Sequence, residues 1–169
     1  MIEGTSSGDR HGLLAAEGWL ELGLAGECLG ELGRLSAEVR RSGRAMNLEW
    51  QAHAARRDWP AALAVGRALA EGHPSDCSGW IQRSFALHEL GRTSEAMDAL
   101  APALEMFPEH PLVRYNMACY ACRLGDLDGA RAWLRDVARL KGIAFVKGLA
   151  EGDPDLELLR AEILSWKKA

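Results

Sequence analysis

The sequence has little of what marks several common classes of protein. Aromatic residues make up only 7% of its 169 residues, and strand-forming runs of Val, Ile and Thr are nearly absent. No stretch of about 18 apolar residues occurs, which excludes a membrane-spanning helix. The Gly/Ser-rich start lacks the basic and apolar regions of a secretory signal. We therefore expect a cytoplasmic protein without a membrane partner.

An excess of positive charge is also missing. The formal net charge is −4, whereas nucleic-acid binding usually requires a basic stripe, so no nucleic-acid partner is expected. The four cysteines, without a secretory signal, are expected to be reduced thiols. The residues that dominate are Ala, Leu, Glu and Arg, which favour helices. This composition predicts an all-α fold.

A repeat of fixed length runs through the chain. Gly91 and Gly125 each follow a leucine in two similar turn signals. The interval from Gly23 to Gly91 is twice the interval from Gly91 to Gly125. A turn between them should fall at Arg57, where Pro60 follows as the first-turn proline of a new helix. The spacing therefore predicts four turns, each within a helical hairpin.

Two further columns of residues share this period. Five residues after each turn the residue is small, as a close helix crossing requires, and twelve residues later a second helix is expected to end. The first column is Cys28, Ala62, Ala96 and Ala130, and the second is Arg40, Pro74, Pro108 and Gly142. The predicted organisation is a flexible N-terminus (1–8), four units (9–42, 43–76, 77–110 and 111–144) and a C-terminal capping segment (145–169).

The third unit carries the most characteristic set of residues, namely Trp80, Leu87, Gly91, Ala96, Leu100, Ala103 and Pro108. With the period and the columns, this set resembles the tetratricopeptide repeat (TPR). The resemblance implies an α-solenoid, a right-handed superhelix of four helix-turn-helix units with a C-terminal capping helix. It also implies a non-enzymatic scaffold that binds a peptide or partner helix in a concave groove. The identity of that protein partner is not specified by the sequence.

The capping helix has its own sequence signals. Asp153 is a suitable N-cap, and Pro154 suits the first helical position. Apolar residues then recur at steps of three and four, which predicts one buried stripe: Leu156, Leu159, Ile163 and Trp166. The segment before it, Ile143 to Ala150, is expected to form a short helix or turn.

Motifs for catalysis are incomplete, so no enzyme, catalytic residue, cofactor or metal is predicted. His88-Glu89 begins like a zinc-protease motif, but Arg92 stands where the second histidine is needed. Cys119 and Cys122 have redox spacing but fall in mid-helix, which favours a packing role. A metal- or redox-responsive switch through His88, Cys119 and Cys122 is the second alternative function.

In the resemblance, the first helix of each unit lines the groove. The expected peptide-binding residues are Asn47, Gln51, Ile81, Gln82, Phe85, His88, Tyr115, Asn116 and Cys119. Amides can donate to and accept from a peptide backbone, and Phe85 and Tyr115 are expected to be exposed anchors, whereas Trp80 is expected in the core. Two alternatives stay open: the C-terminal helix covers this face, or the groove or end caps are buried in a homodimer.

Overall fold

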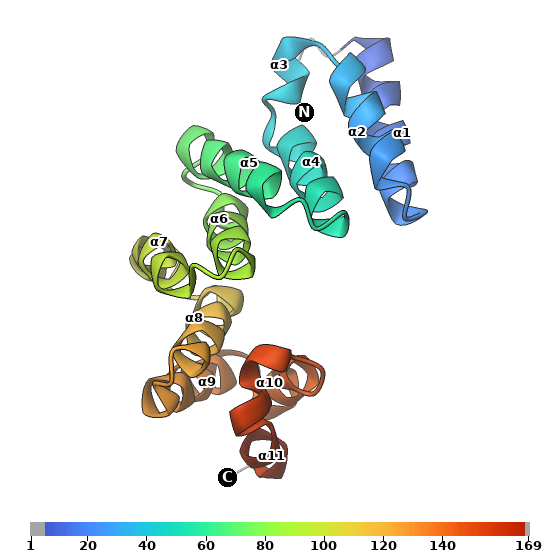
Figure 1. Ribbon diagram of the computed structural model, residues 1–169. Coiled ribbons are helices and arrows are strands. Elements are labelled where there is room, and N and C mark those ends of the chain that lie inside the picture. Colours follow the sequence, from blue (N-terminus) through green and yellow to red (C-terminus); the bar gives the residue numbers. More distant parts are fainter. Residues whose placement is uncertain (1–5, 168–169) are drawn as a thin grey trace. The chain divides into compact units, whose positions relative to one another are not determined.

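The computed structural model describes residues 6–167, which form helices without a strand (Figure 1). Part of the predicted flexible N-terminus, residues 1–5, lies outside the described residues, and the first helix already begins at Ser7. The elements are α1 Ser7–Glu21, α2 Ala25–Arg34, α3 Ala37–Arg40, α4 Gly43–Ala55, α5 Trp59–Gly72, α6 Cys77–Glu89, α7 Thr93–Met106, α8 Pro111–Arg123, α9 Leu127–Lys141, α10 Ile143–Ala150, the 3₁₀ turn η1 Pro154–Leu156 and α11 Glu157–Ser165.

These helices divide into two compact units. Unit 1 is residues 1–86 and contains α1 to α5 and most of α6, whereas unit 2 is residues 87–169 and begins in the last turn of α6. Each unit is described by itself. The four repeat boundaries inferred from the sequence are a finer division than these two units and stay a prediction.

The residues at the four predicted turns have a left-handed backbone conformation. Gly23, Arg57, Gly91 and Gly125 have φ angles of 76°, 55°, 75° and 86°. After each of them, the next N–H donates to the carbonyl five residues earlier at 2.8 to 3.0 Å, as in the Schellman motif that ends helices. The turn predicted at Arg57 is therefore confirmed, although a residue other than glycine adopts it.

The column of small residues is buried without exception. Cys28, Ala62, Ala96 and Ala130 each have 0% of their surface exposed. Each follows a left-handed turn by five residues and so lies in the first part of the hairpin's second helix. The predicted role of these residues at helix crossings agrees with this burial, since a longer side chain would overpack the site.

The first hairpin departs from the sequence expectation. Its second helix was predicted to continue to Arg40, but it breaks between α2 and α3. Leu35 is extended there, with ψ of 154°, and the Ser36 side chain caps α3 by accepting from the Val39 N–H. The Ser36 N–H donates in turn to Asp9 Oδ1 at 2.8 Å. A serine that can cap a new helix and bond to a carboxylate on α1 thus competes with helix continuation.

Two glycines let α5 and α6 pack closely within unit 1. A Cβ built on Gly66 would lie 2.8 Å from the Arg83 backbone nitrogen, and one built on Gly79 would lie 2.6 Å from the backbone nitrogen of Ala70. Both contacts are with backbone, which cannot move aside as a flexible side chain can. This close approach explains why glycine stands at position 66.

Trp80 is not the core residue that its position predicted. Its side chain is half-buried, its indole Nε1 donates to the Pro74 carbonyl at 3.1 Å, and the Arg83 guanidinium lies 4.9 Å from the ring centre. The ring therefore covers the connection before α6 with one face turned to a cation.

The C-terminal part of unit 2 largely follows the prediction. Asp153 caps η1 by accepting from the Asp155 N–H, so the first turn after Pro154 is 3₁₀ rather than α-helical. Residues of the predicted stripe are buried, with Leu156 at 0% and Leu159 and Ile163 at 1% exposure, and Trp166 is half-buried. The positive φ of 87° at Gly142 separates α9 from α10.

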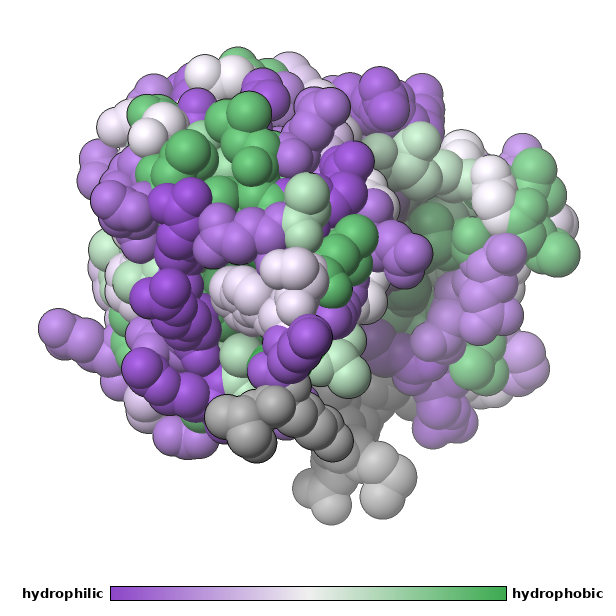
Figure 2. Space-filling model, turned by 90° about the horizontal axis from the view of Figure 1, so that it is seen from below, coloured by the Kyte–Doolittle hydropathy of each residue, from purple (hydrophilic) through white to green (hydrophobic). Residues whose placement is uncertain are grey.

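The surface is mixed in character. The face in Figure 2 is largely hydrophilic, with hydrophobic patches between the polar side chains. Across residues 6–167, none of the helices has both the length and the apolar character needed to cross a bilayer.

We predict that Gly66→Ala destabilises the protein by about 1–3 kcal/mol, because the added methyl group meets the α6 backbone. Gly72→Ala, in the same helix with nothing within 4 Å of its Cβ position, is the matched control and should be neutral or slightly stabilising. Urea denaturation of both variants measures the difference. Equal stabilities for the two variants would contradict the close crossing.

We also predict opposite effects for two adjacent arginines. Arg57→Gly should stabilise the protein by about 0.5 kcal/mol, because relief of the left-handed backbone outweighs the added chain entropy. Arg56→Gly should destabilise it by about 0.5–1 kcal/mol, because φ at Arg56 is −88° and glycine brings no relief there. Thermal and urea unfolding would show this, and shifts of the same sign would refute the strain at Arg57.

Candidate functional site

The predicted groove residues fall into two groups, one in each compact unit. Those of unit 1 lie on α4 and α6 and are called the amide face here: Asn47, Gln51, Ile81, Gln82 and Phe85. Those of unit 2 lie at the end of α6 and on α8: His88, Tyr115, Asn116 and Cys119. The two groups have different chemistry and are considered in turn.

A hydrogen-bonded pair of amides is the centre of the amide face. Gln82 Nε2 donates to Asn47 Oδ1 at 2.7 Å, and Asn47 Nδ2 donates to the Gly43 carbonyl at 2.8 Å. Within the described residues, no donor bonds to Gln82 Oε1. Gln51 lies one turn after Asn47 on α4 and is exposed. The face thus combines an oriented amide pair with an exposed amide and a spare acceptor.

Phe85 was expected to be an exposed anchor, but it belongs to an aromatic cluster of unit 1. Its ring packs edge-on against Trp50 and Trp59, with ring centres 6.1 and 5.8 Å away and interplanar angles of 72° and 62°. The side chain is half-buried, as is Ile81. The cluster fixes the position of Phe85 and leaves only part of its surface available for contact.

Tyr115 and Cys119 are buried, with 5% and 4% of their surfaces exposed. The Tyr115 hydroxyl donates to Asp153 Oδ2 at 2.8 Å, and Cys119 Sγ lies 3.5 Å from the same oxygen. The expectation of an exposed Tyr115 is therefore wrong. Of the alternatives left open by the sequence, coverage by the chain's own C-terminal segment describes these two residues.

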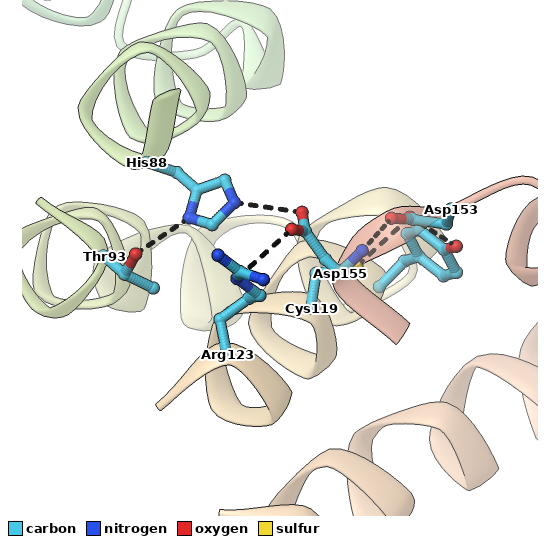
Figure 3. A network of polar contacts seen from close by, with 7 residues as sticks. His88, Thr93, Cys119, Arg123, Asp153 and Asp155 are labelled. Carbon is cyan, nitrogen blue, oxygen red and sulfur yellow. Dashed lines mark hydrogen bonds and ion pairs between the residues drawn. The ribbon is translucent and has the colours of Figure 1, made fainter. Parts of the chain in front are cut away.

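A second carboxylate lies beside the first. His88 Nε2 is 3.0 Å from Asp155 Oδ2, and His88 Nδ1 is 3.0 Å from Thr93 Oγ1 (Figure 3). The Arg123 guanidinium approaches Asp155 Oδ1 at 3.6 Å. We call residues 151–157 the C-terminal hook, and we call the four side chains that hold its carboxylates the donor cradle: His88, Tyr115, Cys119 and Arg123.

Sequence reasoning found half of this arrangement. It placed His88, Tyr115 and Cys119 on one surface, but it assigned Asp153 only a capping role and did not use Asp155 or Arg123. The spacing of Tyr115, Cys119 and Arg123, which follow one another at intervals of one helical turn on α8, was an available signal. Asn116, also predicted for the groove, is half-buried on α8 and makes none of the hydrogen bonds or ion pairs described for the cradle.

Burial keeps two donors of the cradle, Tyr115 and Cys119, protonated. The pKa of the Cys119 thiol is raised well above its usual range, first by burial and then by the charges of Asp153 and Asp155. The pKa of Tyr115 is also raised, by burial first and then by Cys119 and Asp153. Burial raises the pKa of Cys122 as well. A redox-active pair needs a lowered thiol pKa, so Cys119 and Cys122 have the opposite electrostatics.

The side chains that could ligate a metal differ from the set suggested by the sequence, which was His88, Cys119 and Cys122. Atoms of Cys119, Asp153 and Asp155 lie within 4.8 Å of one another, whereas Cys122 is not part of this group. These three side chains could contact one cation. Hydrogen bonds already link Asp153 to the Cys119 thiol and to the Asp155 backbone, and a protonated thiol is a poor metal ligand.

The helical hairpins of unit 2 match a known family. Residues 87–141 match the model of the tetratricopeptide repeat. The chain therefore contains tetratricopeptide repeats (TPRs) in residues 87–141. The sequence match ends at residue 141, so it covers the end of α6, α7, α8 and α9 but neither the hook nor the amide face.

Solved TPR structures show that the likeness of fold extends over most of the chain. TTC0263, a thermophilic TPR protein of Thermus thermophilus, is 17% identical with a TM-score of 0.69, over 94% of this chain and 100% of that one. MamA MSR-1 is 19% identical with a TM-score of 0.64, over 76% and 74% of the two chains. YrrB, described as a TPR protein with an unusual peptide-binding site, is 11% identical with a TM-score of 0.62, over 88% and 81%.

At these identities the structures establish a shared fold and no more. No curated protein sequence matches the TPR chain significantly. Its function must therefore be argued from its own two faces.

We predict that Tyr115→Phe destabilises the TPR protein by about 1–3 kcal/mol at pH 7, because it removes a buried hydrogen bond to a carboxylate. The folded Tyr115 pKa is raised, so this contribution is complete below the unfolded pKa of about 10 and is lost as pH rises above it. The difference in free energy of unfolding between the wild-type chain and Tyr115→Phe should therefore shrink by about 1.4 kcal/mol between pH 7 and pH 11. Urea unfolding at several pH values tests this, and a deficit that is constant with pH would contradict it.

Proposed function

We propose that this TPR protein is a non-enzymatic protein-interaction module that binds an extended peptide or a partner helix. The observation that carries the proposal is the amide face, where the Asn47–Gln82 pair lies beside the exposed Gln51. The peptide-binding site named for YrrB supports peptide recognition by this fold. The groove residues predicted in unit 2, namely His88, Tyr115, Asn116 and Cys119, remain part of the proposal.

The amide face suits a peptide backbone for a physical reason. A backbone presents one donor and one acceptor per residue, and an amide side chain can satisfy both. Gln82 Oε1 is buried and lacks a donor within the described residues, and a buried acceptor without a partner is costly. A turn of the Gln82 side chain that brought this oxygen to a peptide N–H would remove that cost, while the exposed Gln51 could bond to another peptide group.

The aromatic cluster supports the same proposal. Phe85 is held between Trp50 and Trp59, so a partner that packs on its exposed part meets a rigid apolar surface. Little conformational entropy is then lost on binding, which favours affinity. An apolar side chain of the partner beside a backbone held by the amides is the expected mode.

Self-association is a second candidate, favoured by exposed leucines in the first hairpin of unit 1. Leu14 on α1 has 60% of its surface exposed, and Leu22 and Leu24, at the turn before α2, have 71% and 46%. Packing of this hairpin against a second copy would bury these side chains. Light scattering over a range of concentrations tests the homodimer, which requires a dimeric mass that falls on dilution or after Leu22→Ser.

The thiols favour a reducing compartment. Cys28, Cys77, Cys119 and Cys122 are all buried and free. Burial raises the pKa of Cys28, and it raises that of Cys77 to about 11. Since disulfides are not used for stability, we place the protein in the cytoplasm.

Peptide selection on the full chain tests the leading proposal. Peptides selected from a random library should lose about five- to thirtyfold in affinity on Gln51→Ala and on Gln82→Met, because each substitution removes backbone hydrogen bonds worth about 1–2 kcal/mol. Fluorescence anisotropy measures the affinities. Methionine keeps the volume of Gln82, so loss of binding is separable from loss of fold.

Arg67→Ala is the matched control, because Arg67 is exposed on α5, outside the amide face. It should leave peptide affinity unchanged. Failure to select any peptide, or selected peptides that are indifferent to both glutamine substitutions, would overturn the proposal.

A further inference from the structure

The donor cradle has a composition that selects for carboxylates. In the structure every one of its side chains faces an acid: the Tyr115 hydroxyl and the Cys119 thiol face Asp153, and His88 and Arg123 face Asp155. Burial and the nearby acids raise the pKa of Tyr115 and Cys119 and so keep both as donors. A site made of donors favours an acidic ligand over a neutral one.

The hook occupies this site as a peptide ligand would. Its two aspartates are separated by one residue, and around the 3₁₀ turn that begins at Pro154, Asp153 faces α8 whereas Asp155 faces α8 and His88 at the end of α6 (Figure 3). Within the C-terminal segment itself, the Arg160 guanidinium on α11 donates to the Asp153 carbonyl at 2.9 Å and so fixes the backbone of the hook. Leu156, with no exposed surface, follows the acids as an apolar anchor. The hook therefore presents the pattern Asp-x-Asp-Leu to the cradle.

Asp153 and Asp155 accept from donors that are largely shielded from water. His88 has only 9% of its side chain exposed, and Asp155 has 21%, so their contact excludes most water. If the hook left, the donors of Tyr115, Cys119 and His88 would lose their acceptors together. Water would then hydrate these donors, and an acidic group that took the place of the hook would restore the charge-assisted hydrogen bonds.

We propose that the donor cradle is a binding site for acidic peptides of the Asp-x-Asp-Leu type, and that the hook is its internal competitor. This inference rests on the proposed function of the chain as a protein-interaction module and names the class of partner for unit 2. A partner peptide gains access when the hook is released. Binding is then an exchange of one pair of carboxylates for another.

The test uses the full chain and a labelled copy of its own residues 150–159, the peptide AEGDPDLELL. In the variant Asp153→Asn/Asp155→Asn the hook loses both charges, while asparagine still caps η1 well. This variant should bind the peptide at least tenfold more tightly than the wild-type chain in fluorescence anisotropy. A peptide with asparagine at both positions should bind the variant at least tenfold more weakly.

The matched control is Glu151→Gln/Glu157→Gln. It removes the same number of charges from exposed positions of the hook and leaves the cradle occupied, so its affinity should equal that of the wild-type chain. Adding Tyr115→Phe and Arg123→Ala to the asparagine variant should return peptide binding to the wild-type level. Equal binding of the two peptides, or equal affinities for the asparagine and glutamine variants, would overturn the proposal.

A second measurement covers the case in which the asparagine variant does not fold. Excess AEGDPDLELL peptide added to the wild-type chain should increase amide hydrogen exchange in residues 151–159, and the peptide with two asparagines should not. Unchanged exchange with the acidic peptide overturns the proposal. Gln51→Ala lies on the amide face, so adding it to the wild-type chain or to the asparagine variant should leave affinity for the acidic peptide unchanged. If the acidic peptide fails to bind the cradle, the proposal for the amide face therefore still stands.

Discussion

The fold depends on one constraint, which is that two helices can lie against each other only where their backbones can approach. Each hairpin meets it in the same way, with a left-handed residue that reverses the chain and a small residue five positions later, such as Gly91 and Ala96. Because a single hairpin cannot bury both faces, each needs a neighbour, and the fixed period of the sequence follows from repeating this unit. Gly66 and Gly79 extend the constraint to the contact between α5 and α6.

The sequence was informative where this constraint acts. Gly23, Gly91 and Gly125 revealed the period, and the period located a turn at Arg57 that composition alone would not show. It was uninformative where the same helix could continue or stop for similar free energies. Ser36 stops the second helix of the first hairpin because Asp9, far away in sequence, accepts a hydrogen bond from its N–H. No local pattern reveals a partner that lies on a different helix.

The candidate site divides in the same way. The resemblance to the repeat placed Asn47 and Gln82 in one groove, and in the structure a hydrogen bond of 2.7 Å joins them. It could not show that Asp153 covers Tyr115, because the two are distant in sequence and the hook meets α8 only in the folded chain. For the same reason Phe85 seemed an isolated anchor in the sequence, whereas Trp50 and Trp59 enclose it in the fold.

The two faces show how one repeat can serve different partners. The polar side chains of the first helices lie outside the buried column of small residues, so their chemistry can vary while that column stays small. In unit 1 they carry amides, which suit a backbone of either polarity. In unit 2 they carry donors, which suit acids.

Occupation of the donor cradle has a physical consequence for stability. The contacts that fix the hook also help to bury Leu156 and Leu159, so closing the end of the chain and occupying the cradle are the same event. Any ligand that takes the place of Asp153 and Asp155 must compensate for the apolar surface that the released segment exposes. Only a ligand with two carboxylates and an apolar residue after them can replace both the hydrogen bonds and the buried apolar surface of the hook. A single free carboxylate is therefore expected to compete poorly with the hook.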